Sequence, residues 1–175
     1  MLITESYRDL NIRLHRSGRY GLWGDKWAST VTELVRAESA ADVLDYGCGQ
    51  GSLARAVEFP VREYDPAIEE KSAPPDPADI VICTDVMEHI EPELLPNVLN
   101  HLQSLTRKAL FLVISIRPAA KTLEDGRNAH LIVEPPAFWR AEFEKHFLIR
   151  DWQVLNDEVI TTVVPRPNRI ARDDD

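Results

Sequence analysis

The strongest constraint on the fold is the segment Val43-Leu44-Asp45-Tyr46-Gly47-Cys48-Gly49-Gln50-Gly51, where a short apolar run ends and three glycines follow at alternate positions. An apolar run that stops at a glycine-rich turn before a helical segment predicts a strand, a tight loop and a helix. Glycine has no Cβ, so the loop backbone can take positive φ angles and approach a ligand closely. The dinucleotide-binding fingerprint needs another glycine at position 52, and Ser52 stands there, which disfavours a nicotinamide cofactor.

Predicted strands and helices alternate along most of the chain. Residues 148–154 and 159–164 are expected to close the fold as an antiparallel pair around the turn residues Asn156-Asp157. This order implies an α/β fold with a doubly wound, mostly parallel sheet and a ligand at the carboxyl ends of the strands. The other predicted strands are 42–46, 61–65, 79–84 and 110–115, and the predicted helices are 26–38 (capped by Asp25), 52–58, 91–106 and about 136–146.

Four segments lack a predicted regular element. Residues 1–24 are mixed and polar, and Gly18, Gly21 and Gly24 are expected to break any long helix there. Four of the thirteen residues from 66 to 78 are proline, which disfavours helix and strand. The loop 116–134 is long enough to suggest a functional or mobile role. Residues 165–175 are expected to form a flexible tail.

Composition limits the class of protein. The 175 residues fit one domain, and the absence of a signal peptide or a long apolar run predicts a cytoplasmic protein that does not enter membranes. A formal net charge of −9 argues against broad, charge-driven binding of nucleic acid, although basic residues near the N-terminus could form a local patch. The two cysteines form no C-x-x-C pair that would suggest zinc, and a structural disulfide is not expected in the cytoplasm.

A second acid follows the next predicted strand. Asp65 lies twenty residues after Asp45, where its carboxylate can accept hydrogen bonds from both hydroxyls of a ribose. Together, the glycine loop and this acid predict a nucleoside-containing ligand.

These motifs resemble a known family. The pattern D-x-G-x-G-x-G at 45–51 resembles motif I of the class I S-adenosylmethionine-dependent methyltransferases, and Asp-Val-Met-Glu-His-Ile at 85–90 resembles the turn after the strand that these enzymes place beside the first strand. The resemblance covers about residues 41–164. It implies a Rossmann-like methyltransferase fold and S-adenosylmethionine as cofactor. Separately, the chain length predicts a single domain, taken as 1–164, and the glycines between aromatic residues at 20–27 suggest an N-terminal lid, taken as 1–25.

The resemblance also implies roles for individual residues. Gly47, Gly49 and Gly51 would lie beneath the cofactor, and Asp45 would orient its amino group through backbone or water contacts. Asp65 would hold the ribose, and the stretch around Asp85 would line the methionine side.

The chain departs from the family pattern after Asp65. The family usually has a helix, a third strand and another helix before the strand that contains Cys83, and this chain has only the proline-rich bridge. We therefore expect the sheet to lack its third strand, and the usual adenine contact to be missing or relocated. Asp76 and Asp79 are possible substitutes that the resemblance does not assign.

Polar residues near the predicted turn suggest a second kind of chemistry. Asp85, Glu88 and His89, with His130 from the long loop, could hold one divalent cation such as Mg²⁺ or Mn²⁺. The set resembles the metal site of methyltransferases that act on small-RNA 3′ ends. Without a metal, His89 or His130 is a candidate general base, although a structural role is the commoner one for either histidine taken alone.

The sequence therefore predicts an enzyme that transfers a methyl group to an oxygen, nitrogen or carbon atom of a small molecule. Residues 15–27, which include Tyr20, Trp23 and Trp27, and the loop 116–134 are expected to form the acceptor pocket. The alternatives are a metal-dependent RNA-end methyltransferase, an S-adenosylmethionine enzyme that performs intramolecular displacement at the sulfonium, and a non-catalytic partner that binds the cofactor only to fold.

Overall fold

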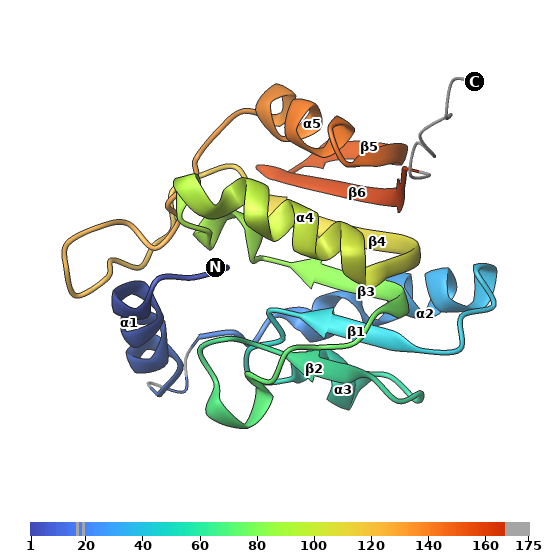
Figure 1. Cartoon of the computed structure of the whole chain (residues 1–175), viewed down its shortest axis with the longest axis horizontal. Helices are drawn as coiled ribbons and strands as arrows, with labels where there is room; N and C mark the ends of the chain where they lie inside the picture. The colour runs from blue at the N-terminus through green and yellow to red at the C-terminus, as the bar shows by residue number, and fades with distance from the viewer. Residues whose placement is uncertain (17, 19, 167–175) are drawn as a thin grey trace, which may run out of the picture.

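The computed structural model describes residues 1–16, 18 and 20–166. Across these residues, six strands form one sheet in the order β2-β1-β3-β4-β6-β5 (Figure 1). The first four in this order are parallel, whereas β6 is antiparallel to both β4 and β5. The strands are β1 (Val43–Tyr46), β2 (Arg62–Tyr64), β3 (Ala78–Thr84), β4 (Thr106–Ser115), β5 (Phe147–Leu155) and β6 (Glu158–Pro165), and the helices are α1 (Glu5–Arg16), α2 (Ala28–Ala37), α3 (Ser52–Ala56), α4 (Leu95–Leu105) and α5 (Pro136–Glu144).

Each face of the sheet is covered by helices. Successive side chains of a strand point to opposite faces, so Val81 and Cys83 of β3 pack with α4 and α5, whereas Ile80 and Ile82 pack with α2 and α3. The apolar stripe of α4 is buried as its spacing predicted. This arrangement confirms the doubly wound α/β fold.

The edge of the sheet beyond β1 is formed by β2. Between β2 and β3, the regular structure consists of one short 3₁₀ turn, Glu69–Lys71. The proline-rich bridge therefore adds no strand to the described sheet, as the sequence predicted. Prolines lack the backbone N–H that a sheet or helix would use.

The C-terminal hairpin is also confirmed. Asn156 and Asp157 join β5 to β6 with φ angles of 51° and 61°. Positive φ at both central residues is typical of a type I′ turn, whose twist matches that of paired strands. The expected tail lies mostly outside the described residues.

The N-terminal segment differs from the prediction, because residues 5–16 form the helix α1. Tyr7 and Asn11 of this helix are buried, and Leu10 and Leu14 pack around Tyr7, Leu123 and Ala129. This spacing is helical, and the Thr4 hydroxyl accepts the Tyr7 N–H at the first turn. Gly18 lies beyond the end of α1 and does not prevent this helix from forming. The expectation of no long helix before residue 25 was therefore wrong.

Two predicted helices begin later than expected. The segment at 26–38 starts as a 3₁₀ turn, Gly24–Trp27, and Asp25 lies inside that turn rather than capping α2. The segment at 91–106 starts as the 3₁₀ turn Pro92–Leu94 before α4, whose first turn contains Pro96. Proline fits a first helical turn because its missing N–H has no partner there.

The long loop 116–134 and α1 lie together at the end of the sheet toward which β1 and β3 point (Figure 1). The Arg127 guanidinium lies over the Tyr7 ring, and Arg13 pairs with Glu124. These contacts place both segments at the carboxyl ends of the parallel strands. No helix in the described part of the chain is long and apolar enough to cross a bilayer.

Candidate functional site

The glycine loop after β1 has the conformation that its sequence predicts. Gly47, Gly49 and Gly51 have φ angles of 77°, 51° and 72°, which disfavour residues with a Cβ. The Gly47 N–H donates to the Tyr64 carbonyl, which ties the loop to the end of β2. A Cβ at Gly47 would overlap Val86 of the neighbouring turn. This glycine is therefore required by the packing of the site, whatever it binds.

Asp65 lies directly beyond β2 and faces the same loop. Its Oδ2 accepts the Gly49 N–H at 3.1 Å, and its Oδ1 accepts the Ala67 N–H at 2.9 Å. A carboxylate has about four acceptor sites, so two remain for a further donor. The two backbone donors fix the orientation of the carboxylate at the sheet edge that holds the glycine loop.

Asp45 is buried at the end of β1 and does not face an open surface. Burial, followed by the nearby Glu63 carboxylate, raises its pKa to about 7. Its side chain is too enclosed to contact a ligand directly in this conformation, since the residue is only 4% exposed.

The N-terminal segment covers the glycine loop. The Gln50 N–H donates to the Gly21 carbonyl at 2.9 Å, and a Cβ on Gly49 would lie 2.7 Å from the Gly21 Cα. His15 Nε2 lies 3.7 Å from Asp65 Oδ2, and the side chains of both residues are less than 10% exposed. Burial lowers the pKa of His15, so this contact is not an ion pair at neutral pH. The segment therefore lies against the predicted ribose acid.

A row of aromatic rings extends from His15 to the turn after β3. The rings of His15 and Tyr20 are 4.9 Å apart, and those of Tyr20 and His89 are 5.6 Å apart. The Lys121 ammonium of the long loop lies over the Tyr20 ring at 4.9 Å. The N-terminal segment and the loop 116–134 thus meet at Tyr20.

The turn after β3 carries the other predicted residues. Asp85 has a φ of 56°, and its N–H donates to the Val113 carbonyl. Burial raises its pKa to about 6, and the Glu158 carboxylate adds to the shift. Glu88 is fully buried, and its Oε1 accepts the Ser115 N–H at 2.9 Å. The turn is therefore tied to the end of β4.

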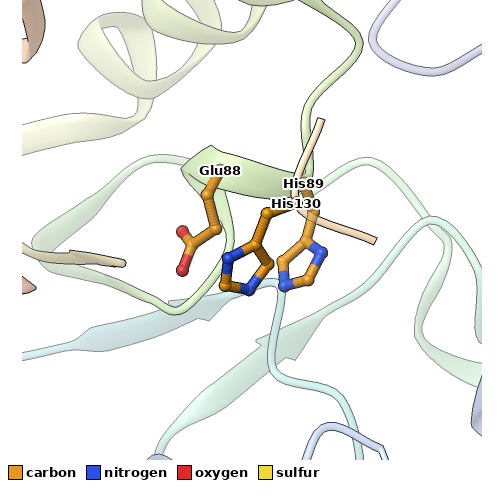
Figure 2. A group of neighbouring side chains, drawn as sticks. All are labelled: Glu88, His89 and His130. Atoms are coloured by element: carbon orange, nitrogen blue, oxygen red, sulfur yellow. The ribbon is translucent and has the colours of Figure 1, made fainter. Parts of the chain in front are cut away.

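Two histidines face each other beside Glu88. His89 comes from the turn and His130 from the long loop, and their rings meet edge to face at 4.7 Å. Figure 2 shows the His130 ring between the Glu88 carboxylate and the His89 ring. One potential ligand atom from each of the three lies within 4.8 Å of the others. Asp85, the fourth residue of the set predicted from the sequence, is not a member of this group.

Several residues of the site were not identified from the sequence. His15 was expected only as part of the pocket segment 15–27, and nothing in its local pattern places it beside Asp65. Lys71, from the proline-rich bridge, donates to the Gly49 carbonyl and pairs with Glu63 at 3.1 Å. Both contacts depend on how the chain folds back onto the glycine loop. Tyr20 and Gly21 belong to the glycine-aromatic segment that had been singled out as a lid.

The chain matches a known protein family. Residues 18–158 match the model of a family described as a methyltransferase domain. No curated protein matches the chain significantly. Many solved structures do, at identities that establish the fold alone.

Three solved structures illustrate the likeness. The DhpI–SAH complex has a TM-score of 0.66 at 14% identity, covering 94% of this chain and 100% of that one. The Burkholderia thailandensis 1,6-didemethyltoxoflavin-N1-methyltransferase, with its substrate and S-adenosylhomocysteine bound, has a TM-score of 0.63 at 16% identity, covering 91% and 87%. The magnesium protoporphyrin IX methyltransferase from Synechocystis PCC 6803, with SAM bound, has a TM-score of 0.56 at 20% identity, covering 81% and 79%. Because the family model matches residues 18–158, most of this chain, the chain belongs to the methyltransferase domain family, and it shares the fold of methyltransferases solved with S-adenosylmethionine or S-adenosylhomocysteine bound.

Proposed function

We propose that this protein binds S-adenosylmethionine at the glycine loop and Asp65 and transfers its methyl group to a small-molecule acceptor. The observation that carries this proposal is the Asp65 carboxylate, which two backbone N–H groups hold beside Gly49 with acceptor capacity to spare. A fixed carboxylate of this kind suits the two hydroxyls of a ribose. The cofactor supplies an activated methyl group, so the protein mainly has to align donor and acceptor and exclude water.

The other cofactor residues follow from their places around this loop. We assign the methionine end to the backbone of Gly47, Gly49 and Gly51, with Asp85 beside it on the neighbouring turn. Asp45 acts from beneath the loop, since its buried side chain supports the backbone rather than contacting the ligand.

The N-terminal segment has to move before the ribose can reach Asp65. His15 and Asp65 bury each other in the described conformation, so no hydroxyl can approach that carboxylate. His15 Nδ1 is buried without a hydrogen-bond partner, which costs about 1–3 kcal/mol for a polar atom of this kind. Moving His15 away would restore its contact with water and free Asp65. We therefore assign the described residues between 15 and 25 (15, 16, 18 and 20–25) to a lid that opens for the cofactor and closes over it.

His89 and His130 are the proposed catalytic residues on the acceptor side. Burial lowers the pKa of His89 to about 3, and burial also lowers the pKa of His130, so both imidazoles are neutral at pH 7. Without a bound metal, each ring keeps one unprotonated nitrogen that can accept a hydrogen bond from the acceptor and take its proton. His130 comes from the loop that meets Tyr20, so the acceptor would enter between this loop and the lid.

A small acceptor fits the chain better than a polymer. The formal net charge of −9 opposes the attraction that a nucleic-acid backbone requires. Two of the structurally similar enzymes are named as methyltransferases of 1,6-didemethyltoxoflavin and of magnesium protoporphyrin IX. These observations support a small-molecule substrate rather than the 3′ end of an RNA.

Calorimetry with S-adenosylhomocysteine tests the cofactor proposal. We expect one site per chain, and we expect Asp65→Ala to weaken binding by about 1.5–3 kcal/mol, the cost of losing hydrogen bonds to a charged group. Asp9→Asn removes a charge from the exposed surface of α1 and should leave affinity unchanged. Circular dichroism would verify that both variants fold. Absence of binding by the wild-type protein, or equal affinity of the Asp65 variant, would refute the proposal.

A further inference from the structure

Two side chains of the turn after β3 and one of the loop 116–134 each leave one coordinating atom without a partner among the described residues. His89 Nδ1 lies 2.7 Å from the Ala129 carbonyl oxygen, and His130 Nδ1 lies 2.6 Å from the Arg117 carbonyl oxygen. A carbonyl oxygen can only accept a hydrogen bond, so each Nδ1 carries the proton. Each neutral ring therefore presents a bare Nε2 lone pair. Metal-binding histidines are commonly oriented by this kind of Nδ1–H bond to a backbone carbonyl.

Glu88 supplies the third atom. The residue is completely buried; its Oε1 accepts the Ser115 N–H, whereas its Oε2 is buried with no hydrogen-bond partner. An unpaired carboxylate oxygen in a protein interior is unfavourable unless a proton or a cation compensates it. Its neighbours here are the two imidazoles, whose Nδ1 protons are donated to backbone carbonyls rather than to Oε2. A cation bound at this point would displace any proton from the carboxyl group and compensate its charge.

The three residues are close enough to bind the same ion. One potential ligand atom from each residue, a ring nitrogen or a carboxylate oxygen, lies within 4.8 Å of those from the other two, and Figure 2 shows the carboxylate and the two rings gathered side by side. Ligands at about 2.0–2.2 Å from one metal lie roughly 3–4 Å apart, so a contraction of about 1 Å would complete the site. His130 lies on the long loop, which can supply that movement.

We propose that Glu88, His89 and His130 bind one divalent transition-metal ion, of the Zn²⁺, Co²⁺, Fe²⁺ or Mn²⁺ class. Two imidazoles and one carboxylate suit these ions, whereas Mg²⁺ prefers a shell of oxygen atoms. Three protein ligands also leave at least one coordination position for water or an oxygen of the acceptor. That last role rests on the proposed methyl transfer, and it would favour an acceptor that is methylated on oxygen.

A titration with Co²⁺ tests the site directly, because Co²⁺ has visible absorption that reports its ligands. The protein is stripped with chelator, freed of any affinity tag, and titrated with Co²⁺ and then with Zn²⁺, Mn²⁺ and Mg²⁺ by competition. We expect one Co²⁺ per chain, displaced by Zn²⁺, and binding at least about 10-fold tighter than that of Mg²⁺. No stoichiometric binding, or equal affinity for Mg²⁺, would overturn the proposal.

Variants assign the ligands. His130→Gln removes a ligand from a partly exposed loop, and Glu88→Gln removes the buried one; each should weaken Co²⁺ binding by about 10-fold or more. His146→Gln changes a histidine outside the cluster and should have no effect. Equal loss in the His146 variant, or no loss in the His130 variant, would place the metal elsewhere.

The same samples separate this inference from the proposed function. S-adenosylhomocysteine binding is measured in chelator, without metal. Cofactor binding with no Co²⁺ site would refute the metal proposal alone, whereas Co²⁺ binding without cofactor binding would refute the proposed function and leave the metal site standing.

Discussion

The contact between Gly21 and Gly49 gives the sharpest prediction about the lid. Both residues have positive φ, and the Gln50 N–H donates to the Gly21 carbonyl at 2.9 Å. In Gly21→Ala, the new Cβ would lie 2.9 Å from the Gly49 Cα, whereas ordinary contacts begin at 3.4 Å. The lid backbone must therefore withdraw from the glycine loop by about 0.5 Å or more, the difference between these distances.

A matched control separates this contact from backbone strain. Gly18 has a φ of 66° against 72° at Gly21, and a Cβ at Gly18 would meet nothing within 4 Å. Both alanine variants therefore carry the same left-handed cost of about 1–2 kcal/mol. Only Gly21→Ala should also weaken the Gln50 hydrogen bond, which contributes about 0.5–1.5 kcal/mol.

Hydrogen exchange at the Gln50 amide measures that difference. We expect exchange to be about 2- to 13-fold faster in Gly21→Ala than in Gly18→Ala, which is the same energy expressed as a rate ratio. Equal exchange rates in the two variants would show that the lid does not rest on the glycine loop, and the reasoning about lid closure would fail.

Three further predictions concern stability, each measured by urea unfolding. Burial raises the pKa of Asp45 to about 7, so the folded protein keeps this proton to a higher pH than the unfolded chain does. The free energy of unfolding should therefore fall as pH rises from about 4 to 7. Asp45→Asn should remove this fall, and at pH 8 its free energy of unfolding should exceed that of wild type by as much as about 4 kcal/mol. Leu102→Ala, in the buried stripe of α4, should cost about 2–5 kcal/mol, while Leu148→Ala on a half-exposed strand position should cost far less. Asp157→Gly should stabilise the protein by roughly 0.5 kcal/mol, because glycine takes the positive φ of this turn without strain.

Each of these has a contrary outcome. Parallel pH profiles for wild type and Asp45→Asn would mean that Asp45 is ionised in the folded protein. Similar losses for the two leucine variants would contradict the assignment of the core. A destabilised Asp157→Gly would mean that the aspartate side chain has a role in the turn that its backbone geometry does not explain.

The fold was largely predictable because its signals are local. Continuous apolar runs marked β3 and β4, leucine spacing marked α4, and prolines marked the bridge after Asp65. The sequence did not predict the helix α1, because its apolar stripe is thin and three glycines follow at positions 18, 21 and 24. Its stability comes from packing on the loop residues Leu123 and Ala129, which are more than a hundred positions away.

In the site, too, the features with local sequence signals were predictable and the contacts between distant segments were not. By itself, the sequence determined the glycine loop, the acid after β2 and the Glu-His turn, because these depend on residue type and short spacing. Only the tertiary structure decided that His15 and Gly21 cover the loop, that Asp85 stays outside the Glu88 cluster, and which nitrogen of each histidine is bare. Those outcomes depend on contacts between segments distant in sequence, and the backbone carbonyls that fix the histidine protons have no signature in the order of residues.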